Sequence, residues 1–211
     1  MARLKTILQR AREAIRPVGD NLTLDIPKRV DCGVDGRFSV LIIKIDHLGD
    51  FVTAIPALQR LRSAWKNADI TLLCTDSLVE FVQTLQVVDR VLGVASSPSL
   101  VDEPDVIALR QVPYDVAIDL RHDGDTRHLL TAFRARFLVG YASKHPGPQL
   151  DIALPELEKS ARRRGRRGIN NRARLSLLVE AAIQSIQVAD VRPDRQSRTE
   201  QRQKDGRTEG R

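Results

Sequence analysis

Short runs of aliphatic residues alternate along the chain with segments whose apolar residues recur at helical spacing. The run from Val40 to Ile45 consists mostly of β-branched and aliphatic residues, which is typical of a strand buried on both faces of a parallel sheet. Further strands are expected at 70–74, 87–94, 114–120 and 137–141, and helices at 50–66, 77–85, 102–110, 126–134 and 172–189. This alternation predicts a three-layer α/β fold with a parallel, Rossmann-like sheet.

Glycine and proline mark several expected boundaries. Gly93 should break the third strand, and Pro56 predicts a helix boundary or a mild kink near residues 54–55. The segment 144–155 contains three prolines and one glycine, so it is expected to leave the domain.

A polar turn, Asp-His-Leu-Gly-Asp at 46–50, joins the first strand to its helix. Ligands of open parallel sheets bind at the carboxyl ends of the strands, so Asp50 should lie at the mouth of a site. Aspartate is also a favoured helix N-cap, and Asp50 can be a helix cap, a functional carboxylate or both. Gly49 suits the turn because glycine allows close backbone approach and positive φ.

A second polar cluster follows the strand at 114–120. Its members are Asp119, Arg121, His122, Asp125 and Arg127. In a parallel sheet this cluster shares the carboxyl edge with Asp50, where Arg121 and Arg127 could hold phosphates of an anionic ligand. An exposed loop with charge pairs explains the same residues equally well.

Charge is concentrated near the C-terminus. Residues 1–154 carry 19 basic and 19 acidic side chains, whereas residues 155–211 carry 15 and 8 and account for the whole net charge of +7. The high pI therefore gives no reason to expect nucleic-acid binding by the lobe, and the basic segment has no stacking aromatics. Residues 195–211 contain no apolar residue, so a disordered tail is expected over 191–211.

The first sixteen residues predict an amphipathic helix with a basic face, which could lie on an anionic membrane surface or pack on the lobe. No apolar run approaches the roughly 20 residues needed to cross a bilayer. Two distant cysteines, Cys32 and Cys74, fit a reducing, cytoplasmic compartment. The residues predict neither a metal site nor a cofactor.

Several of these segments together resemble family 9 glycosyltransferases, the ADP-heptose:lipopolysaccharide heptosyltransferases and their relatives. The resemblance rests on Ile-Lys-Ile-Asp-His-Leu-Gly-Asp at 43–50, Ile-Pro-Ala-Leu at 55–58 and Leu-Arg at 61–62, and on the segments 68–73, 114–120 and 136–141. It spans roughly residues 38–145 and implies the N-terminal lobe of a two-lobe, GT-B type enzyme.

The resemblance implies transfer of a heptose or related sugar from a nucleotide donor such as ADP-heptose to a lipopolysaccharide-type or other lipid-linked glycan. Asp50 takes the place of the family's proposed catalytic base. The other substrate-binding candidates are Asp46, His47, Leu48, Gly49, Asp119, Arg121, His122 and Arg127. For His47, a solvent-facing turn residue is the alternative.

Family members hold the donor mainly with a second lobe, and no second strand–glycine–helix unit follows residue 190. The expected organisation is an N-terminal helix and loop at 1–37, the acceptor lobe at 38–154, a basic linker and helix at 155–190, and the tail. A truncated enzyme at the inner face of the membrane, with its second lobe supplied in trans, is one expectation. A non-catalytic lobe that binds a glycan or a protein is the alternative.

Overall fold

A computed structural model of the chain describes residues 28–30, 37–95, 104–121, 126–142, 148–155 and 170–188. The expected N-terminal helix at 1–16, residues Cys32, His122 and Asp125, residues 156–169 of the expected basic linker, and the tail at 191–211 lie outside the described residues.

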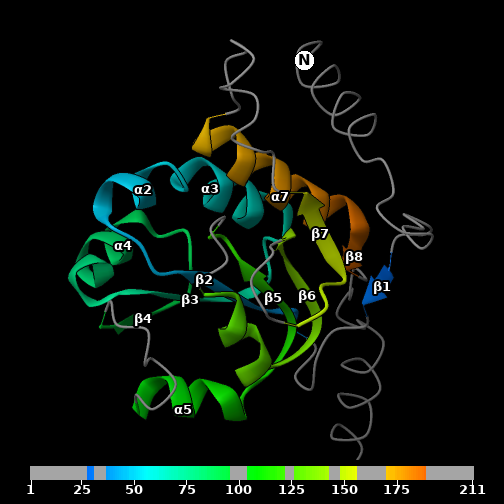
Figure 1. The fold of residues 1–211 in the computed structure, drawn as a ribbon, viewed down its shortest axis with the longest axis horizontal. Helices are drawn as coiled ribbons and strands as arrows, with labels where there is room; N and C mark the ends of the chain where they lie inside the picture. Colours follow the sequence, from blue (N-terminus) through cyan, green and yellow to red (C-terminus); the bar gives the residue numbers. More distant parts are fainter. Residues whose placement is uncertain are drawn as a thin grey trace, which may run out of the picture.

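Six strands form one parallel sheet at the centre of the molecule (Figure 1). They are β2 (Ser39–Lys44), β3 (Asp69–Thr75), β4 (Arg90–Val94), β5 (Pro113–Asp119), β6 (Arg134–Ala142) and β7 (Ile152–Pro155). Their spatial order is β4-β3-β2-β5-β6-β7, and every neighbouring pair is parallel. This order confirms the Rossmann-like α/β fold, with the strand order reversing between β2 and β5.

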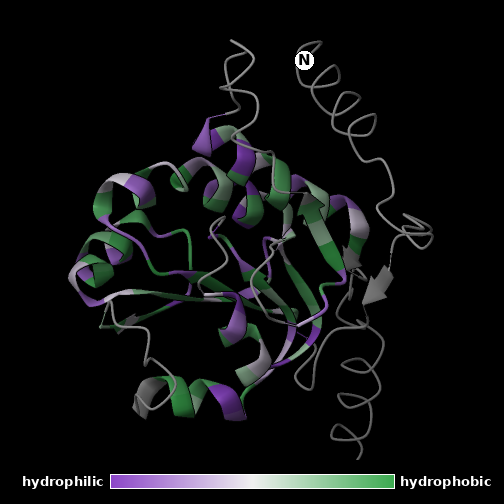
Figure 2. Cartoon of the chain, viewed as in Figure 1, coloured by the Kyte–Doolittle hydropathy of each residue, from purple (hydrophilic) through white to green (hydrophobic). Residues whose placement is uncertain are grey.

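Helices cover both faces of the sheet (Figure 1). The described helical elements are α2 (Leu48–Val52), α3 (Ile55–Ala64), η1 (Asp76–Leu78), α4 (Val79–Leu85), α5 (Pro104–Gln111), η3 (Arg127–Ala132) and α7 (Asn171–Ser185). Alternate residues of β2 enter opposite cores: Val40 and Ile42 pack with α3 and α7, and Leu41 and Ile43 pack with α5 and η3. Apolar residues fill the strands and the inner helix faces (Figure 2), as the continuous aliphatic runs predict.

The helix expected at 50–66 is two helices. α2 ends at Val52, and α3 begins at Ile55 with Pro56 in its first turn, where the missing amide proton costs no intrahelical hydrogen bond. The boundary predicted near residues 54–55 is thus confirmed.

One local prediction is wrong. Gly93 does not break β4, because it pairs with Cys74 inside the strand. A Cβ atom at Gly93 would lie 2.2 Å from Asp76 Oδ1, so glycine is needed there for close approach of η1 to the strand. The helix expected at 126–134 is present but shorter, because η3 is a 3₁₀ helix over Arg127–Ala132 and β6 begins at Arg134.

The segment 144–155 was expected to leave the domain, and this prediction is wrong. Its last four residues form β7, which pairs with β6 and completes the sheet. α7 then packs on the same core as α3 through Leu175, Leu178 and Val179. The helix ends at Ser185 instead of 189, because residues 186–188 form β8 (Ile186–Val188), which pairs with β1 (Lys28–Val30).

Candidate functional site

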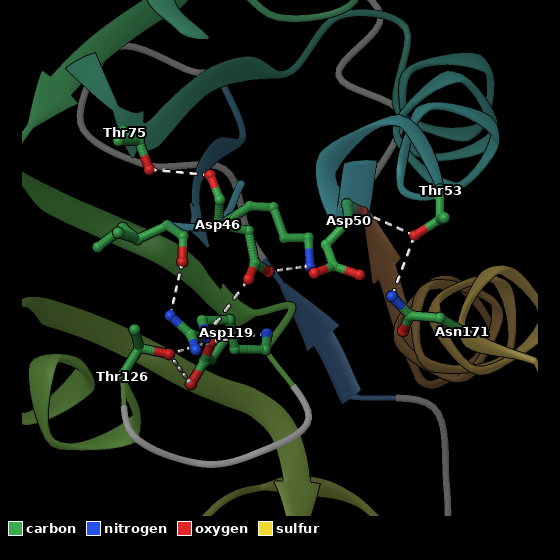
Figure 3. A network of polar contacts seen from close by, with 10 residues as sticks. Asp46, Asp50, Thr53, Thr75, Asp119, Thr126 and Asn171 are labelled. Carbon is green, nitrogen blue, oxygen red and sulfur yellow. Dashed lines mark hydrogen bonds and ion pairs between the residues drawn. The ribbon is translucent and has the colours of Figure 1, made fainter. Parts of the chain in front are cut away.

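The two predicted polar clusters meet at one edge of the sheet. Asp46 follows the carboxyl end of β2, and Asp119 is the last residue of β5, the neighbouring strand. The strand order reverses between these two strands, at the position where ligands of open α/β sheets bind. Figure 3 shows Asp46, Asp50 and Asp119 around this point. The prediction that the clusters share the carboxyl edge is confirmed for Asp119 and Arg121, whereas His122 and Asp125 lie outside the described residues.

A buried lysine lies beneath the edge. Lys44 is the last residue of β2, has 1% of its surface exposed, and pairs through Nζ with the carboxylate of Asp46. Asp46 is also close to a second cation, because Arg121 Nε lies 3.9 Å from Asp46 Oδ1. Lys44 is not among the site residues predicted from the sequence, although a lysine within a run of aliphatic side chains is a recognisable signal.

The backbone around Asp46 is held by two further hydrogen bonds. Thr75 Oγ1 donates to the carbonyl oxygen of Asp46 at 3.0 Å, and Arg121 Nη1 donates to the carbonyl oxygen of Ile45 at 2.8 Å. The turn that follows β2 is therefore tied to the ends of β3 and β5, which fixes its position on the sheet.

Asp119 orders the start of the neighbouring loop. Its carboxylate, 2% exposed, accepts from the Arg121 amide at 3.0 Å and from Thr126 Oγ1 at 2.9 and 3.0 Å. These contacts join Asp119 to Arg121 and Thr126, the described residues on either side of 122–125. Asp119 thus shapes the edge from within, rather than presenting an exposed carboxylate.

Arg127 makes backbone contacts on the far side of β6. Its Nη1 donates to the Tyr141 carbonyl at 3.3 Å, and its Nη2 donates to the Pro148 carbonyl at 2.8 Å. The guanidinium therefore joins the end of β6 to the segment that enters β7. A phosphate at Arg127 would have to share the guanidinium with these two carbonyls.

Asp50 lies in the first turn of α2, and the N-cap of this helix is His47. No side chain caps α2, so the prediction that Asp50 is a cap is wrong. The helix begins two residues earlier than expected, which places Asp50 inside it. Its side chain is exposed and lies on the same edge as Asp46 (Figure 3). An exposed carboxylate at the switch point can accept a proton from a bound hydroxyl.

The residues before Asp50 leave its surroundings open. His47 and Gly49 are exposed, and Leu48 is 52% exposed. Nothing lies within 4 Å of the position that a Cβ atom on Gly49 would take, and its φ is not positive. The turn does not require glycine for its own conformation, so the expectation of a positive φ is wrong, and the backbone remains open to close approach.

Where the structure describes it, the edge has neither a reactive thiol nor a set of metal ligands. Burial, with Asp76 nearby, raises the pKa of Cys74 to about 12, which keeps this thiol protonated and unreactive. Among the described residues, no group of three or more histidine, cysteine and acidic side chains could hold a metal ion. Within the same part of the chain, no helix has the length and apolar character needed to span a bilayer.

The fold and the polar edge define the chain as a Rossmann-like α/β lobe with an exposed carboxylate at the topological switch point. Comparison with solved structures finds this lobe in sugar-transferring enzymes. It is similar to E. coli heptosyltransferase WaaC with ADP, at 18% identity and a TM-score of 0.54, over 74% of this chain and 50% of that one. WaaC with ADP-2-deoxy-2-fluoro heptose matches at 18% identity and a TM-score of 0.52, over 74% and 51% of the two chains.

A family 9 glycosyltransferase from Veillonella parvula is also similar, at 17% identity and a TM-score of 0.58, over 82% of this chain and 50% of that one. The chain thus spans about half the length of each of these structures. No protein-family model and no curated protein matches the sequence. At these identities the likeness shows a shared fold.

Proposed function

We propose that this chain is the acceptor-binding lobe of a glycosyltransferase that transfers a heptose or related sugar to a lipopolysaccharide-type or other lipid-linked glycan. The observation that carries the proposal is the exposed carboxylate of Asp50 in the first turn of α2, at the carboxyl edge of β2. The likeness of the lobe to half of WaaC and half of a family 9 glycosyltransferase supports the same function.

In the proposed reaction Asp50 acts as general base. It takes the proton from an acceptor hydroxyl as that oxygen bonds to the anomeric carbon of the donor sugar, and the bond from this carbon to the diphosphate breaks. Asp46, His47, Leu48 and Gly49 would line the acceptor sugar, because they form the open turn beside Asp50. Arg121, held between Asp46 and the Ile45 carbonyl, would supply positive charge towards an anionic acceptor.

The donor in this proposal is a nucleotide sugar such as ADP-heptose. Two of the matched WaaC structures carry ADP or an ADP-heptose analogue, which supports a donor of this class. The chain spans half of those proteins, so we propose that a second lobe, in the same polypeptide or in trans, holds the donor. Sequencing of the DNA downstream of residue 211 tests this directly, and a second strand–glycine–helix lobe in any reading frame is the expected result.

The base role is tested by comparing Asp50→Asn with wild type in the presence of the second lobe. Turnover should fall about 10²- to 10⁴-fold, the usual effect of losing a general base. Since Asp50 caps no helix, its stability contribution is small, and Asp50→Ala should melt near wild type. Glu80→Gln is the matched control, because Glu80 is an exposed acid in the first turn of α4. Full turnover by Asp50→Asn would refute the base role and favour a non-catalytic glycan- or protein-binding lobe.

We further propose that the protein works at the cytoplasmic face of a membrane, peripherally attached by the basic amphipathic segment 1–16. Binding to vesicles that contain anionic lipid should weaken with salt and be lost when residues 1–16 are deleted. Equal co-sedimentation of the deleted and full-length chains would refute the attachment.

A further inference from the structure

The turn that carries Asp50 is joined to a helix far along the chain. Thr53, which follows α2, donates from Oγ1 to the backbone carbonyl of Asp50 at 2.7 Å. The same hydroxyl accepts from Asn171 Nδ2 at 3.1 Å, and Asn171 is the first residue of α7. Figure 3 shows Thr53 between Asp50 and Asn171, with a dashed hydrogen bond to each of them. A hydroxyl can donate one hydrogen bond and accept another, so both bonds form together.

This connection is separate from the main contact between α3 and α7. Further along the two helices, Arg60 donates from Nε to Glu180 Oε2 at 3.0 Å and from Nη2 to Glu180 Oε1 at 3.2 Å. Leu175, Leu178 and Val179 of α7 are buried in the core. α7 is therefore docked without Asn171, and the Asn171–Thr53 hydrogen bond is not needed to hold the helix in place.

α2 itself has little to fix it. It is five residues long, lacks a side-chain cap, and exposes Leu48 and Val52, so its packing depends mainly on the buried ring of Phe51. Short helices are marginal without tertiary contacts. The hydrogen bond from Thr53 holds the backbone carbonyl of Asp50 itself, whereas the packing of Phe51 holds only the neighbouring residue.

We propose that Thr53 and Asn171 are positioning residues for Asp50, so that the docked α7 fixes the site of proton transfer. This inference rests on the proposed role of Asp50 as the base. A general base works within hydrogen-bond reach of the proton that it removes. If the turn that carries Asp50 becomes more mobile, turnover should therefore fall more than acceptor binding does.

Amide hydrogen exchange of the full chain tests the positioning. The reporters are the amides of Phe51 and Ala54, which donate to the His47 and Phe51 carbonyls at 2.9 and 2.8 Å. Thr53→Val, which keeps the shape and removes the hydroxyl, and Asn171→Ala should speed their exchange about 3- to 10-fold, the usual effect of one hydrogen bond. Sheet amides should exchange as in wild type.

Two matched variants separate positioning from general loosening of the fold. Thr53→Ser keeps the hydroxyl and should retain wild-type exchange. Glu180→Ala removes the Arg60–Glu180 contact between α3 and α7 without touching the α2 turn. Wild-type exchange in Thr53→Val, or equal acceleration of the α2 amides in Glu180→Ala, would overturn the positioning role.

Turnover with the second lobe gives the catalytic readout. Thr53→Val should lower kcat with KM for the acceptor nearly unchanged, and Thr53→Ser should restore kcat. A Thr53→Val enzyme with full kcat would overturn the proposal. If Asp50 is not the base, Asp50→Asn should show full turnover. That result is distinct from full kcat in Thr53→Val alone, so a failure of the base role can be told apart from a failure of the positioning role.

Discussion

At the scale of single residues, the site depends on a charge that is almost entirely out of solvent. Lys44 is 1% exposed and has Asp46 as its ion-pair partner, with 14% of the Asp46 side chain exposed. Burying an unpaired cation costs free energy of folding. The Asp46 carboxylate is therefore needed to neutralise Lys44, whether or not Asp46 also binds a substrate. The same pair places a carboxylate and a lysine directly beneath the turn that leads to Asp50.

Asp46→Asn should therefore lower the free energy of unfolding by about 3–5 kcal/mol, the usual cost of removing one partner of a buried ion pair. Urea denaturation measures this, and Asp50→Asn, at an exposed carboxylate, is the control that should stay near wild type. A loss below about 1 kcal/mol in Asp46→Asn would contradict this requirement, because it would mean that water or the asparagine oxygen solvates the Lys44 ammonium as well as the carboxylate does.

Asp89 gives a second residue-scale prediction, on pH. Burial alone would raise its pKa, but the Ile70 amide and the Arg62 guanidinium hold the pKa below the usual 3.8. A depressed pKa in the folded state stabilises the fold above the unfolded value, and this contribution is lost as pH falls from about 4 through the folded value. Asp89→Asn should flatten the acid side of a stability–pH curve, and an unchanged curve would contradict the assignment.

At the scale of elements, the central strands could be predicted and the edge strand β7 could not. The buried strands of a parallel sheet are continuous aliphatic runs, so β2, β3 and β5 are visible in the sequence. β7 was missed because its short sequence, Ile152–Pro155, follows a proline-rich segment and depends on the exposed edge of β6. Its formation is set by tertiary pairing, which local sequence does not encode.

The same limit applies to the site. Asp46, Asp50, Asp119 and Arg121 could be assigned to one edge because parallel strands place their carboxyl ends together. The Thr53–Asn171 hydrogen bond joins residues 118 positions apart, and no local pattern indicates it. The capping role of Asp50 was mispredicted because α2 begins at Leu48 rather than at Asp50.

Two glycines test the packing of elements. At Gly93, a Cβ atom would lie 2.7 Å from Val79 Cγ2 and 2.9 Å from Asp76 Cα, so η1 would have to move. Gly93→Ala should cost about 1–3 kcal/mol of unfolding free energy, as overpacking does. Gly49→Ala should be neutral or slightly stabilising, since the space is empty and alanine favours helix. Equal melting temperatures for the two variants would contradict this difference.

At the scale of the whole molecule, the described residues form one complete six-stranded lobe, and that lobe matches half of each related structure. α7 belongs to this lobe, because Leu175, Leu178 and Val179 are buried in its core. The chain spans about half of each of these structures, which is why the proposed function includes a second lobe.

The tail at 191–211 is predicted to be dispensable for the lobe, because residues 195–211 have no apolar side chain to bury. A chain that ends at residue 190 should melt at the same temperature as the full chain. A chain that ends at residue 169 lacks α7 and should melt much lower or fail to fold. A clearly lower melting temperature for the chain that ends at residue 190 would contradict the prediction for the tail.

In the proposed function, the carboxyl edge around Asp50 binds the acceptor glycan. The most direct test is an NMR titration, in which a deacylated lipopolysaccharide core oligosaccharide is added to the isotopically labelled chain and the amide chemical shifts are measured. We expect the shifted amides to cluster in the turn at 46–53, at Arg121 and at the start of α7. Shifts confined to the opposite edge of the sheet, or none at saturating oligosaccharide, would contradict this proposal.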